Sequence, residues 1–417
     1  MTIVKYVGRS VETTLIEALT DSPVVILNGP RQSGKSTLLS HLAGSRPSTA
    51  LITLDASAER AAAHDDPEGY VLAIHDRLDA DTVAIDEVQL VPGLFRAVKY
   101  AVDRDRKPGR FILAGSTRLL ALPALSDSLA GRMEVVELWP LTQGELAGRR
   151  DGFLAAVLRG DLAMQPGGEA RGRTIDRAVT GGFPPVIQRA PGRRRRWFTN
   201  YVASVIERDI AVLASLERVG QIPRIVSLIA ARTGGLINMA EIARDSGVPV
   251  RTLASYLTWL ERVFLIHRLP GWSSNRTSRA VKAPKIHLVD SGVLGSYLGV
   301  HANTVDNAEI GQLLETFVVG ELRRQLAWSD ETVELFHFRS PDGIEIDVVA
   351  EDSRGRLVGI EVKSSVGIDG RAFRGLRHLQ QRHPDRFVGG IVLYCGTATL
   401  PFGPDLKAMP ISSLWTA

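Results

Sequence analysis

A glycine-rich octapeptide, preceded by an apolar run and followed by a helical pattern, restricts the fold of this chain more than any other feature. Residues 29–36 read GPRQSGKS and fit the pattern GxxxxGK[ST]. The apolar run 24–27 predicts a buried strand, and residues 36–42 predict a helix. In this context the pattern indicates a loop whose backbone amides cradle phosphate, rather than an ordinary glycine-rich turn.

Each residue type in this loop suits a nucleoside triphosphate. Gly29 and Gly34 permit backbone angles that point consecutive N–H groups at phosphate oxygens. Lys35 is expected to reach the β and γ phosphates, and the Ser36 hydroxyl is expected to ligate Mg²⁺. Thr37, the next residue, is assigned to the same site. The sequence therefore predicts a site for ATP and Mg²⁺.

A second apolar strand ends in two carboxylates. Residues 82–87 read TVAIDE, and a strand buried on both faces delivers its last residues to the ligand edge of a parallel sheet. Asp86 is predicted to hold Mg²⁺, directly or through water, and Glu87 to orient and activate the attacking water. The pair favours hydrolysis over binding alone, although two adjacent acids also suit a solvated strand end.

Two further candidates come from the next strands. The apolar run 111–114 leads into Gly115, and a hydroxyl just after it, Ser116 or Thr117, is expected beside the γ phosphate. Ser116 is the one assigned to the nucleotide site, although the sequence does not choose between the two. Arg132 precedes another strand and is a candidate for the arginine that stabilises charge on the transferring phosphoryl group, although any surface arginine looks the same in a sequence.

Composition limits the class of protein. The chain has 417 residues, 44% of them apolar and 23% charged, which is ordinary globular composition for two or three domains. No apolar run approaches the roughly 18 residues that cross a bilayer, and the N-terminal residues do not fit an export signal, so we expect a cytoplasmic protein without a membrane partner. The single cysteine, Cys395, excludes an intrachain disulfide and a cysteine-based zinc site and is expected in a buried strand.

Charge alone argues weakly for a polyanionic partner, because the formal net charge is only +4. The run Arg193 to Arg196, followed by Trp197 and Phe198, has the composition of a phosphate-contacting segment with aromatic neighbours. A solvated helix end has the same composition.

The periodicity divides the chain into four parts. Strand and helix signals alternate through residues 1–150, which predicts a three-layer αβα domain. A linker and helical segment is expected over 151–215, a helical winged-helix-like module over 216–285, and an α/β domain over 286–417.

The helical part contains a helix-turn-helix pattern. Asn238, with Glu241 three positions later, predicts the start of a short helix, and a turn at 247–249 precedes a longer helix. Arg251, Thr252 and Ser255 face outward on that helix, and residues 268–285 are the candidate wing. The module is expected either to contact DNA through these residues or only to pack within the protein.

The C-terminal part contains a predicted β-hairpin, 344–350 and 357–363. Strand periodicity puts Glu361 and Lys363 on one face, and Asp347 on the partner strand is a candidate to join them. Asp347 and Glu361 would bind a divalent metal, and Lys363 would position or activate water for phosphodiester cleavage. Glu315, among apolar residues of a helix, is a fourth candidate metal ligand. An ordinary amphipathic hairpin is the alternative.

The order of the motifs GPRQSGKST, AIDEVQ, LAGSTRLL, ELWPLTQGE, GGFP, KIHLVDSGVLGSYLG, EIDVV and IEVKSS resembles a widespread prokaryotic ATPase family. The resemblance covers nearly the whole chain and implies an AAA-type P-loop domain, a winged-helix segment and a C-terminal domain similar to the PD-(D/E)xK nuclease fold. Asp347, Glu361 and Lys363 match the nuclease motif, with Glu315 as the helix acid, whereas Pro341-Asp342 stands apart from Asp347. In AAA-type proteins a finger such as Arg132 reaches a neighbour's ATP, which implies a homo-oligomer.

These patterns lead to two hypotheses. In the first, an ATP-hydrolysing protein couples its nucleotide state to a DNA-binding or nuclease-like C-terminal half. In the second, a nucleotide-gated regulatory or binding protein carries an inactive nuclease-like domain. A small-molecule kinase is disfavoured because no compact acceptor lid is evident.

Overall fold

The computed structural model describes residues 6–46, 48–118, 129–161, 167–210, 219–301 and 307–416, and the chain divides into two compact units. Unit 1 comprises Met1–Leu141 with Arg262–Phe264, and unit 2 comprises Thr142–Glu261 with Leu265–Ala417.

The first boundary therefore falls at Leu141, earlier than the expected residue 150. Thr142 caps helix α7 (Gln143–Leu146), and the Gln143 N–H donates to Glu321 Oε2 at 2.9 Å, so this helix belongs to unit 2. The three parts expected after residue 150 form one unit, apart from Arg262–Phe264.

Unit 1 is built on a five-stranded parallel sheet with the order β2-β3-β4-β1-β5. Because all strands run the same way, the ends of β1, β3 and β4 meet at one edge. Since β4 lies between β1 and β3, its last residues are placed between the loop after β1 and the acids after β3. The strands are β1 (Val24–Asn28), β2 (Thr49–Thr53), β3 (Thr82–Asp86), β4 (Phe111–Gly115) and β5 (Met133–Glu137).

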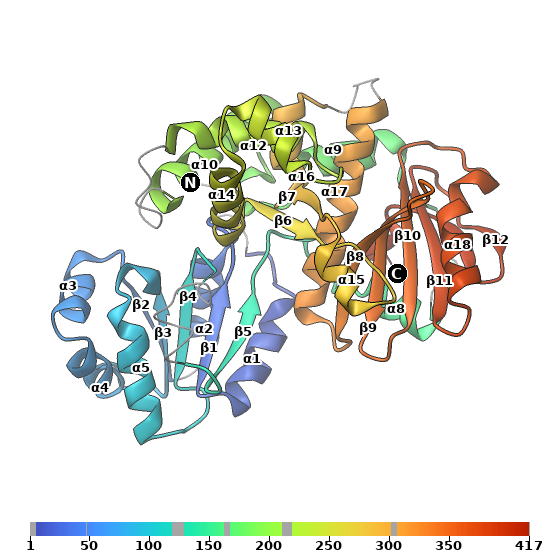
Figure 1. Ribbon diagram of the computed structural model, residues 1–417. Helices are drawn as coiled ribbons and strands as arrows, with labels where there is room; N and C mark the ends of the chain where they lie inside the picture. The colour runs from blue at the N-terminus through green and yellow to red at the C-terminus, as the bar shows by residue number, and fades with distance from the viewer. Residues whose placement is uncertain are drawn as a thin grey trace. The chain divides into compact units, whose positions relative to one another are not determined.

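Helices cover the sheet of unit 1 (Figure 1). Val24 and Ile26 join a core with residues of helices α4 (Pro67–Leu78) and α5 (Gly93–Arg104). Val25 and Leu27, on the opposite face of the strand, are also fully buried. Burial on both faces explains the uninterrupted apolar runs of these strands. The helical segments are α1 (Val11–Asp21), α2 (Lys35–Ser45), α3 (Ser57–Asp65), α4 (Pro67–Leu78), the 3₁₀ turn Val88–Leu90 and α5 (Gly93–Arg104).

The first part of unit 2 is helical. Its segments are α8 (Phe153–Arg159), α9 (Arg171–Thr180), the 3₁₀ turn Pro184–Val186, α10 (Pro191–Val205), the π-helical turn Ile206–Ile210, the 3₁₀ turn Val219–Gln221, α12 (Ile222–Ala231), α13 (Met239–Ser246) and α14 (Val250–Arg262). Asn238 caps α13 by accepting the Glu241 N–H at 3.2 Å, as the spacing predicts. An antiparallel pair, β6 (Ile266–Leu269) and β7 (Lys285–Leu288), follows, and Leu236 bridges to Lys285.

The segment between β6 and β7, part of the expected wing, packs against the C-terminal sheet of unit 2. It contains helix α15 (Arg276–Val281), and Gly271 bridges to His337 of strand β8 (Val333–Arg339). The Trp272 indole donates to Glu351 Oε2 at 2.7 Å, and Arg279 donates to the same oxygen at 2.6 Å. A buried carboxylate of strand β9 (Glu345–Asp352) therefore holds this connection.

The C-terminal part of unit 2 is a six-stranded sheet with the order β12-β13-β11-β10-β9-β8. The predicted hairpin is present as β9 (Glu345–Asp352) and β10 (Leu357–Lys363), which pair antiparallel. Helix α18 (Arg374–Arg382) contributes Leu376 and Leu379 to a core with Ile346 of β9. The other elements are α16 (Ser291–Leu298), α17 (Asn307–Gln325), the 3₁₀ turns Leu326–Trp328 and Gly370–Phe373, β8 (Val333–Arg339), α18 (Arg374–Arg382), β11 (Phe387–Tyr394), β12 (Leu400–Gly403), β13 (Leu406–Pro410) and α19 (Ser413–Thr416).

A buried arginine joins segments of unit 2 that are distant in sequence. Arg324 of α17 donates to Asp290 at 2.5 Å and to Glu321 at 3.0 Å. Asp290 also accepts the N–H groups of Gly182 and Gly292, at 2.9 and 2.8 Å. The motifs GGFP and VDSG, which carried part of the family resemblance, are thus held by one ion-pair network.

Cys395 is buried directly after β11, and burial raises the pKa of its thiol to about 11. Among the described helices, none combines the length and the apolar character needed to cross a bilayer.

We predict that Gly375→Ala destabilises unit 2. A Cβ on Gly375, the second residue of α18, would lie 2.2 Å from the backbone oxygen of Glu345, so the helix must move off β9. The expected loss in the free energy of unfolding is about 1–3 kcal/mol, visible as a lower midpoint of chemical denaturation followed by circular dichroism.

Gly172 is the matched control, because it is the second residue of α9 and has open space around its Cβ position. Gly172→Ala is expected to leave stability unchanged or slightly higher. Equal destabilisation by both substitutions would contradict the prediction.

Candidate functional site

The glycine-rich loop lies at the carboxyl edge of the unit 1 sheet, between β1 and α2. Gly34 has φ 102°, a conformation that favours glycine, and a Cβ on Gly29 would lie 2.1 Å from the carbonyl oxygen of Leu138. Both glycines are therefore required by the backbone. Because the first N–H groups of a helix have no acceptor within the helix, the start of α2 offers donors and a positive dipole to an anion.

Lys35 is buried with its ammonium group inside the loop. Its Nζ donates to the carbonyl oxygens of Gly29 and Pro30, at 2.8 and 2.9 Å. These partners are neutral, and phosphate oxygens are stronger acceptors for an ammonium group than carbonyls are. The arrangement suits a cation that transfers its hydrogen bonds to an arriving phosphate.

Ser36 and Asp86, the two predicted ligands of Mg²⁺ in unit 1, are in contact. Ser36 Oγ donates to Asp86 Oδ2 at 2.5 Å, and the other carboxylate oxygen accepts the Glu87 N–H at 2.9 Å. Asp86 is 3% exposed at the end of β3, which fixes it at the carboxyl edge. A hydroxyl and a carboxylate are the oxygen donors that Mg²⁺ prefers, so the residues present fit the ion. Thr37 lies exposed on the first turn of α2.

Glu87 is connected to Ser116 through Gln89, a residue that sequence reasoning did not single out. Gln89 Nε2 donates to Glu87 Oε2 and, at 3.2 Å, to Ser116 Oγ. Burial raises the pKa of Glu87, and the neighbouring Asp86 raises it further. In contrast, the buried Thr117 Oγ1 has no hydrogen-bond partner within the described residues. Of the two hydroxyls left open by the sequence, Ser116 is the one linked to Glu87.

Arg9 is a second residue that sequence reasoning missed. It lies before α1 and is 8% exposed, and it donates to the carbonyl oxygens of Ser33, at 2.8 Å, and Trp139, at 2.5 Å. It thereby ties the phosphate loop to the segment that follows β5. No motif marks an isolated arginine 20 residues before the loop, so only the structure reveals this contact.

Arg132 lies apart from these residues. It precedes β5, at the amino edge of the sheet and opposite the phosphate loop, and it forms a bidentate ion pair with Asp103 at 2.5 and 3.1 Å. This arginine lowers the pKa of the Asp103 carboxyl. The structure therefore does not bring Arg132 to the phosphate loop of its own chain, and its role at a neighbour's nucleotide stays a prediction.

In unit 2, Glu315 and Asp347 are brought together around a lysine. Lys285 Nζ, on the first residue of β7, lies 2.8 Å from Glu315 Oε1 and 3.2 Å from Asp347 Oδ1. Burial disfavours the charged amine, but the two carboxylates outweigh burial and raise the pKa of Lys285. Asp347 Oδ2 accepts the Val362 N–H at 2.9 Å, where the β9–β10 pairing ends.

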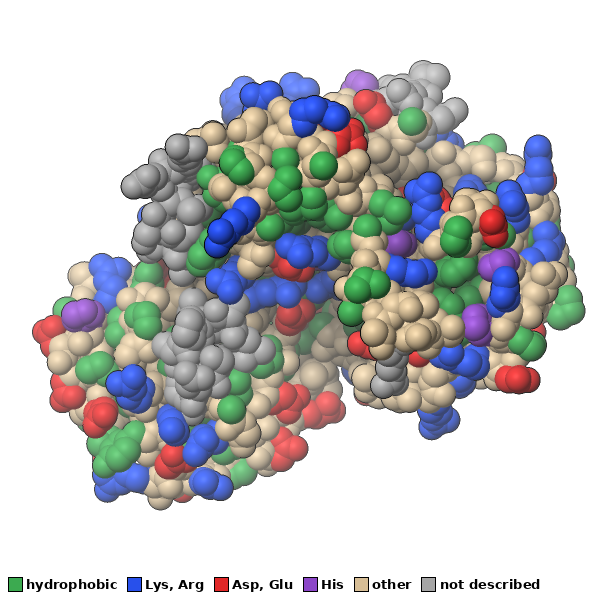
Figure 2. Space-filling model, in the orientation of Figure 1, with side chains coloured by type: hydrophobic (Ala, Val, Ile, Leu, Met, Phe, Trp, Pro, Cys, Tyr) green, Lys and Arg blue, Asp and Glu red, His purple; other side chains and the backbone are tan. Residues whose placement is uncertain are grey.

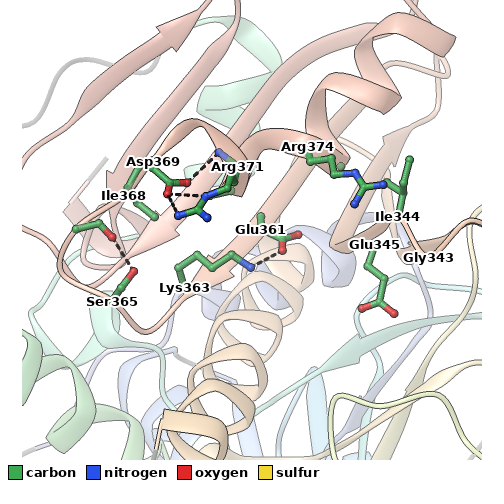
Figure 3. Close-up of a pocket in the computed structure, with 13 residues that line it drawn as sticks. Gly343, Ile344, Glu345, Glu361, Lys363, Ser365, Ile368, Asp369, Arg371 and Arg374 are labelled. Atoms are coloured by element: carbon green, nitrogen blue, oxygen red, sulfur yellow. Dashed lines mark hydrogen bonds and ion pairs between the residues drawn. The ribbon is translucent and has the colours of Figure 1, made fainter.

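Glu361 and Lys363 form a pair of their own at the floor of a cleft. Lys363 Nζ donates to Glu361 Oε1 at 2.7 Å (Figure 3). The cleft has a volume of about 450 Å³ and is also lined by Arg371 and Arg374. Burial raises the pKa of Glu361 to about 7, with Asp347 adding to the shift.

The three acids predicted to bind a divalent metal in unit 2 are paired with lysine side chains in the structure. In the described part of the chain, no group of three or more His, Cys, Asp or Glu side chains is arranged to hold a metal ion. The physical reason at Glu315, Asp347 and Glu361 is that the ammonium groups of Lys285 and Lys363 already take carboxylate oxygens of all three residues.

The basic run on α10 is only partly available to a ligand. Arg193, Arg195 and Arg196 are exposed, whereas Arg194 is half-buried and donates to Thr180 Oγ1. Phe198 is buried and Trp197 stacks on Tyr201, so these aromatic rings belong to the packing of unit 2.

Comparison with known proteins places the chain among relatives of similar length. A Mycobacterium tuberculosis protein described as "Uncharacterized protein Rv2008c" is 30% identical over 417 residues, covering 98% of this chain and 84% of the relative. A Mycobacterium bovis protein, Mb2031c, matches with the same figures. The chain belongs to the family of these mycobacterial proteins. A Haemophilus influenzae protein is 23% identical over 319 residues, covering 73% of this chain and 71% of that protein.

Three family models match successive parts of this family member. Residues 21–147 match the AAA domain, 172–304 a domain of unknown function (DUF8612) and 310–414 a second one (DUF4143). The AAA match contains the phosphate loop, Asp86, Glu87 and Gln89, so unit 1 is an AAA-type P-loop domain with a nucleotide-binding loop. The AAA-type P-loop domain expected from the motif order is thereby confirmed, and ATP hydrolysis stays a prediction.

Among solved structures, the replication initiator DnaA bound to AMPPCP and single-stranded DNA aligns with a TM-score of 0.30 and 16% identity, covering 61% of this chain and 90% of DnaA. AMPPCP-bound DnaA from Aquifex aeolicus aligns with a TM-score of 0.26 and 14% identity, covering 60% and 85%.

Proposed function

We propose that unit 1 binds and hydrolyses ATP. The observation that carries this proposal is the contact between Ser36 Oγ and Asp86 Oδ2, because it joins the phosphate loop to the acid at the end of β3. A loop that only gripped phosphate would not need a second acid, Glu87, linked through Gln89 to the end of β4. The three strand ends together supply the groups that phosphoryl transfer requires.

Each residue of the site has its own role in the proposed binding and hydrolysis of ATP. The loop amides and Lys35 bind and orient the triphosphate. Mg²⁺, held by Ser36 and Asp86, would neutralise charge on the phosphate oxygens. Glu87 orients the attacking water and accepts its proton, and its raised pKa suits a base better than that of an ordinary glutamate. Ser116, through Gln89, would report the state of the γ phosphate to Glu87.

We further propose that unit 2 binds nucleic acid and that its state depends on the nucleotide in unit 1. Helix α18 has the sequence RGLRHLQQR, with no acid, and borders the cleft that contains Glu361 and Lys363. Arg374 and Arg382 are exposed on it, and Figure 2 shows basic side chains over the area that α18 occupies in Figure 1. Arginine is well suited to phosphate contacts. The alternative remains a nucleotide-gated regulatory protein whose partner is not a nucleic acid.

The order of α12, α13, α14 and the β6–β7 pair, with the bridge from Leu236, supports a winged-helix module within this half. Arg251 and Ser255 are exposed on α14, as a recognition helix requires. The connection between β6 and β7 is held by Glu351, so DNA contact by this module would come from α14 rather than from the wing. A homo-oligomer with Arg132 at a neighbour's nucleotide belongs to the same proposal.

The ATPase proposal predicts different losses for two variants. Lys35→Ala is expected to abolish saturable binding of a fluorescent ATP analogue. Glu87→Gln is expected to bind normally but to release phosphate at least about 100-fold more slowly, because it removes the base and keeps the shape. Phosphate release with Mg²⁺ and ATP measures turnover, and Glu68→Gln, at an exposed acid of α4, is the control that should behave as wild type. Undiminished release by Lys35→Ala would rule the proposal out.

The link between Gln89 and Glu87 predicts a change in the pH dependence of turnover. The Gln89 amide favours the charged form of Glu87 and so lowers its pKa, whereas burial and Asp86 raise it. Removing the amide with Gln89→Ala should raise this pKa further, and the pH below which turnover falls should move upward. Ser116→Ala leaves the Gln89–Glu87 hydrogen bond in place and should not move it. A downward shift in Gln89→Ala would show that Glu87 is not the titrating base.

The nucleic-acid proposal predicts a role for α18. The double substitution Arg374→Gln/Arg382→Gln should weaken DNA binding in fluorescence anisotropy and reduce the salt slope of log K by about 2. The matched control, Arg193→Gln/Arg195→Gln on α10, should leave both unchanged. Loss of binding in the control alone would move the site to α10, and absence of binding by wild type would leave the regulatory alternative.

A further inference from the structure

The three acids of the nuclease-like half raise the question of which cation balances them. Glu315, Asp347 and Glu361 come from α17, β9 and β10, and Asp347 raises the pKa of both glutamates, so the three groups repel one another. The resemblance to a nuclease fold implies a divalent metal at this point. The structure supplies a different cation, the ammonium group of Lys285.

We propose that Lys285 is a resident cation that takes the place of the divalent metal between Glu315 and Asp347, so that this half of the protein neither binds a metal there nor cuts phosphodiester bonds with one. The inference does not depend on the proposed ATPase activity or on nucleic-acid binding.

Geometry gives the first argument. Lys285 Nζ lies within hydrogen-bond distance of one oxygen of each carboxylate, at 2.8 and 3.2 Å. A divalent ion needs the same oxygens at about 2.0–2.6 Å, so metal and ammonium exclude one another. The side chain of Lys285 is only 7% exposed, which leaves it little room to swing into solvent.

The remaining oxygens give the second argument. Asp347 Oδ2 accepts the Val362 N–H, and Glu361 Oε1 accepts Lys363. The second oxygen of Glu315 faces Gly234, where even a Cβ would come within 2.9 Å. Among the carboxylate oxygens of these three acids, Glu361 Oε2 is the one that is buried without a hydrogen-bond partner in the described part of the chain. Two oxygens that accept no hydrogen bond from the described residues, Glu315 Oε2 and Glu361 Oε2, do not make a site for an ion that takes six or more ligands.

Charge gives the third argument. A fixed ammonium among buried carboxylates offsets their repulsion, and a divalent ion added beside it would meet a like charge at low dielectric. The Glu315 oxygen that Lys285 contacts, Oε1, also lies 3.8 Å from Nε2 of the His287 ring. Burial, and then Lys285, lower the pKa of His287 to about 3, so this ring adds no positive charge.

Removing the ammonium should therefore open a metal site. Lys285→Met keeps the length and apolar stem of the side chain but leaves the carboxylates without their cation. We expect Mn²⁺, titrated into the nucleotide-free full chain and followed by electron paramagnetic resonance, to gain one bound ion in Lys285→Met. The gain should be lost again in Lys285→Met/Asp347→Asn. Mn²⁺ should raise the melting temperature of Lys285→Met but not that of wild type.

Lys282→Met is the matched control, because Lys282 lies three residues earlier and its ammonium contacts the Trp272 carbonyl rather than a carboxylate. It should gain no Mn²⁺. Wild-type binding of Mn²⁺ that Asp347→Asn abolishes would overturn the proposal. So would a Lys285→Met chain that is folded and insensitive to Mn²⁺, or one that stays unfolded even when Mn²⁺ is present, because in neither case does the metal replace the ammonium.

Discussion

Buried positive charges surrounded by oxygen atoms organise both units of this protein. Burying a charge costs several kcal/mol unless it is paired and hydrogen-bonded, so each such cation dictates the chain segments around it. In unit 1, Lys35 gathers the carbonyls of the phosphate loop. In unit 2, Arg324 joins Asp290 to Glu321, and Lys285 joins Glu315 to Asp347. Segments that are far apart in the sequence come together around Arg324 and Lys285 because each segment supplies some of the carboxylate oxygens that pair with these cations.

The charge of the oxygen atoms around a buried cation distinguishes a cation that is available to bind a ligand from one that stabilises the fold. Lys35 donates to neutral carbonyls, which an anionic phosphate outcompetes, so its hydrogen bonds are transferable. Lys285 is held by two carboxylates, and nothing short of another cation replaces it there. Two buried lysines in one chain thus have opposite roles: one is poised for a substrate, and the other fills the place where a cofactor would bind.

Sequence patterns of a few residues were enough to predict the elements that depend on interactions between near neighbours in the chain. The phosphate loop, the strand ending at Asp86 and the hairpin of β9 and β10 follow from apolar runs, glycines and alternation within a few residues. Gln89, Arg9 and Lys285 were missed because their roles depend on partners that the fold brings close: Ser116, the Trp139 carbonyl and Glu315. The connection between β6 and β7 resembled a free wing because Glu351, which holds it, lies about 80 residues away.

The position of Lys285 shows why the chemistry of the C-terminal half cannot be read from its last domain alone. The match to a domain of unknown function over residues 310–414 contains Glu315, Asp347, Glu361 and Lys363, the residues from which a metal-dependent nuclease was predicted. Lys285 lies in the preceding match, 172–304, on a strand that pairs with β6. A side chain from one sequence domain therefore completes the charge balance of the next. The two domains are one unit in the physical sense, because separating them would leave buried carboxylates without the cation that β7 supplies.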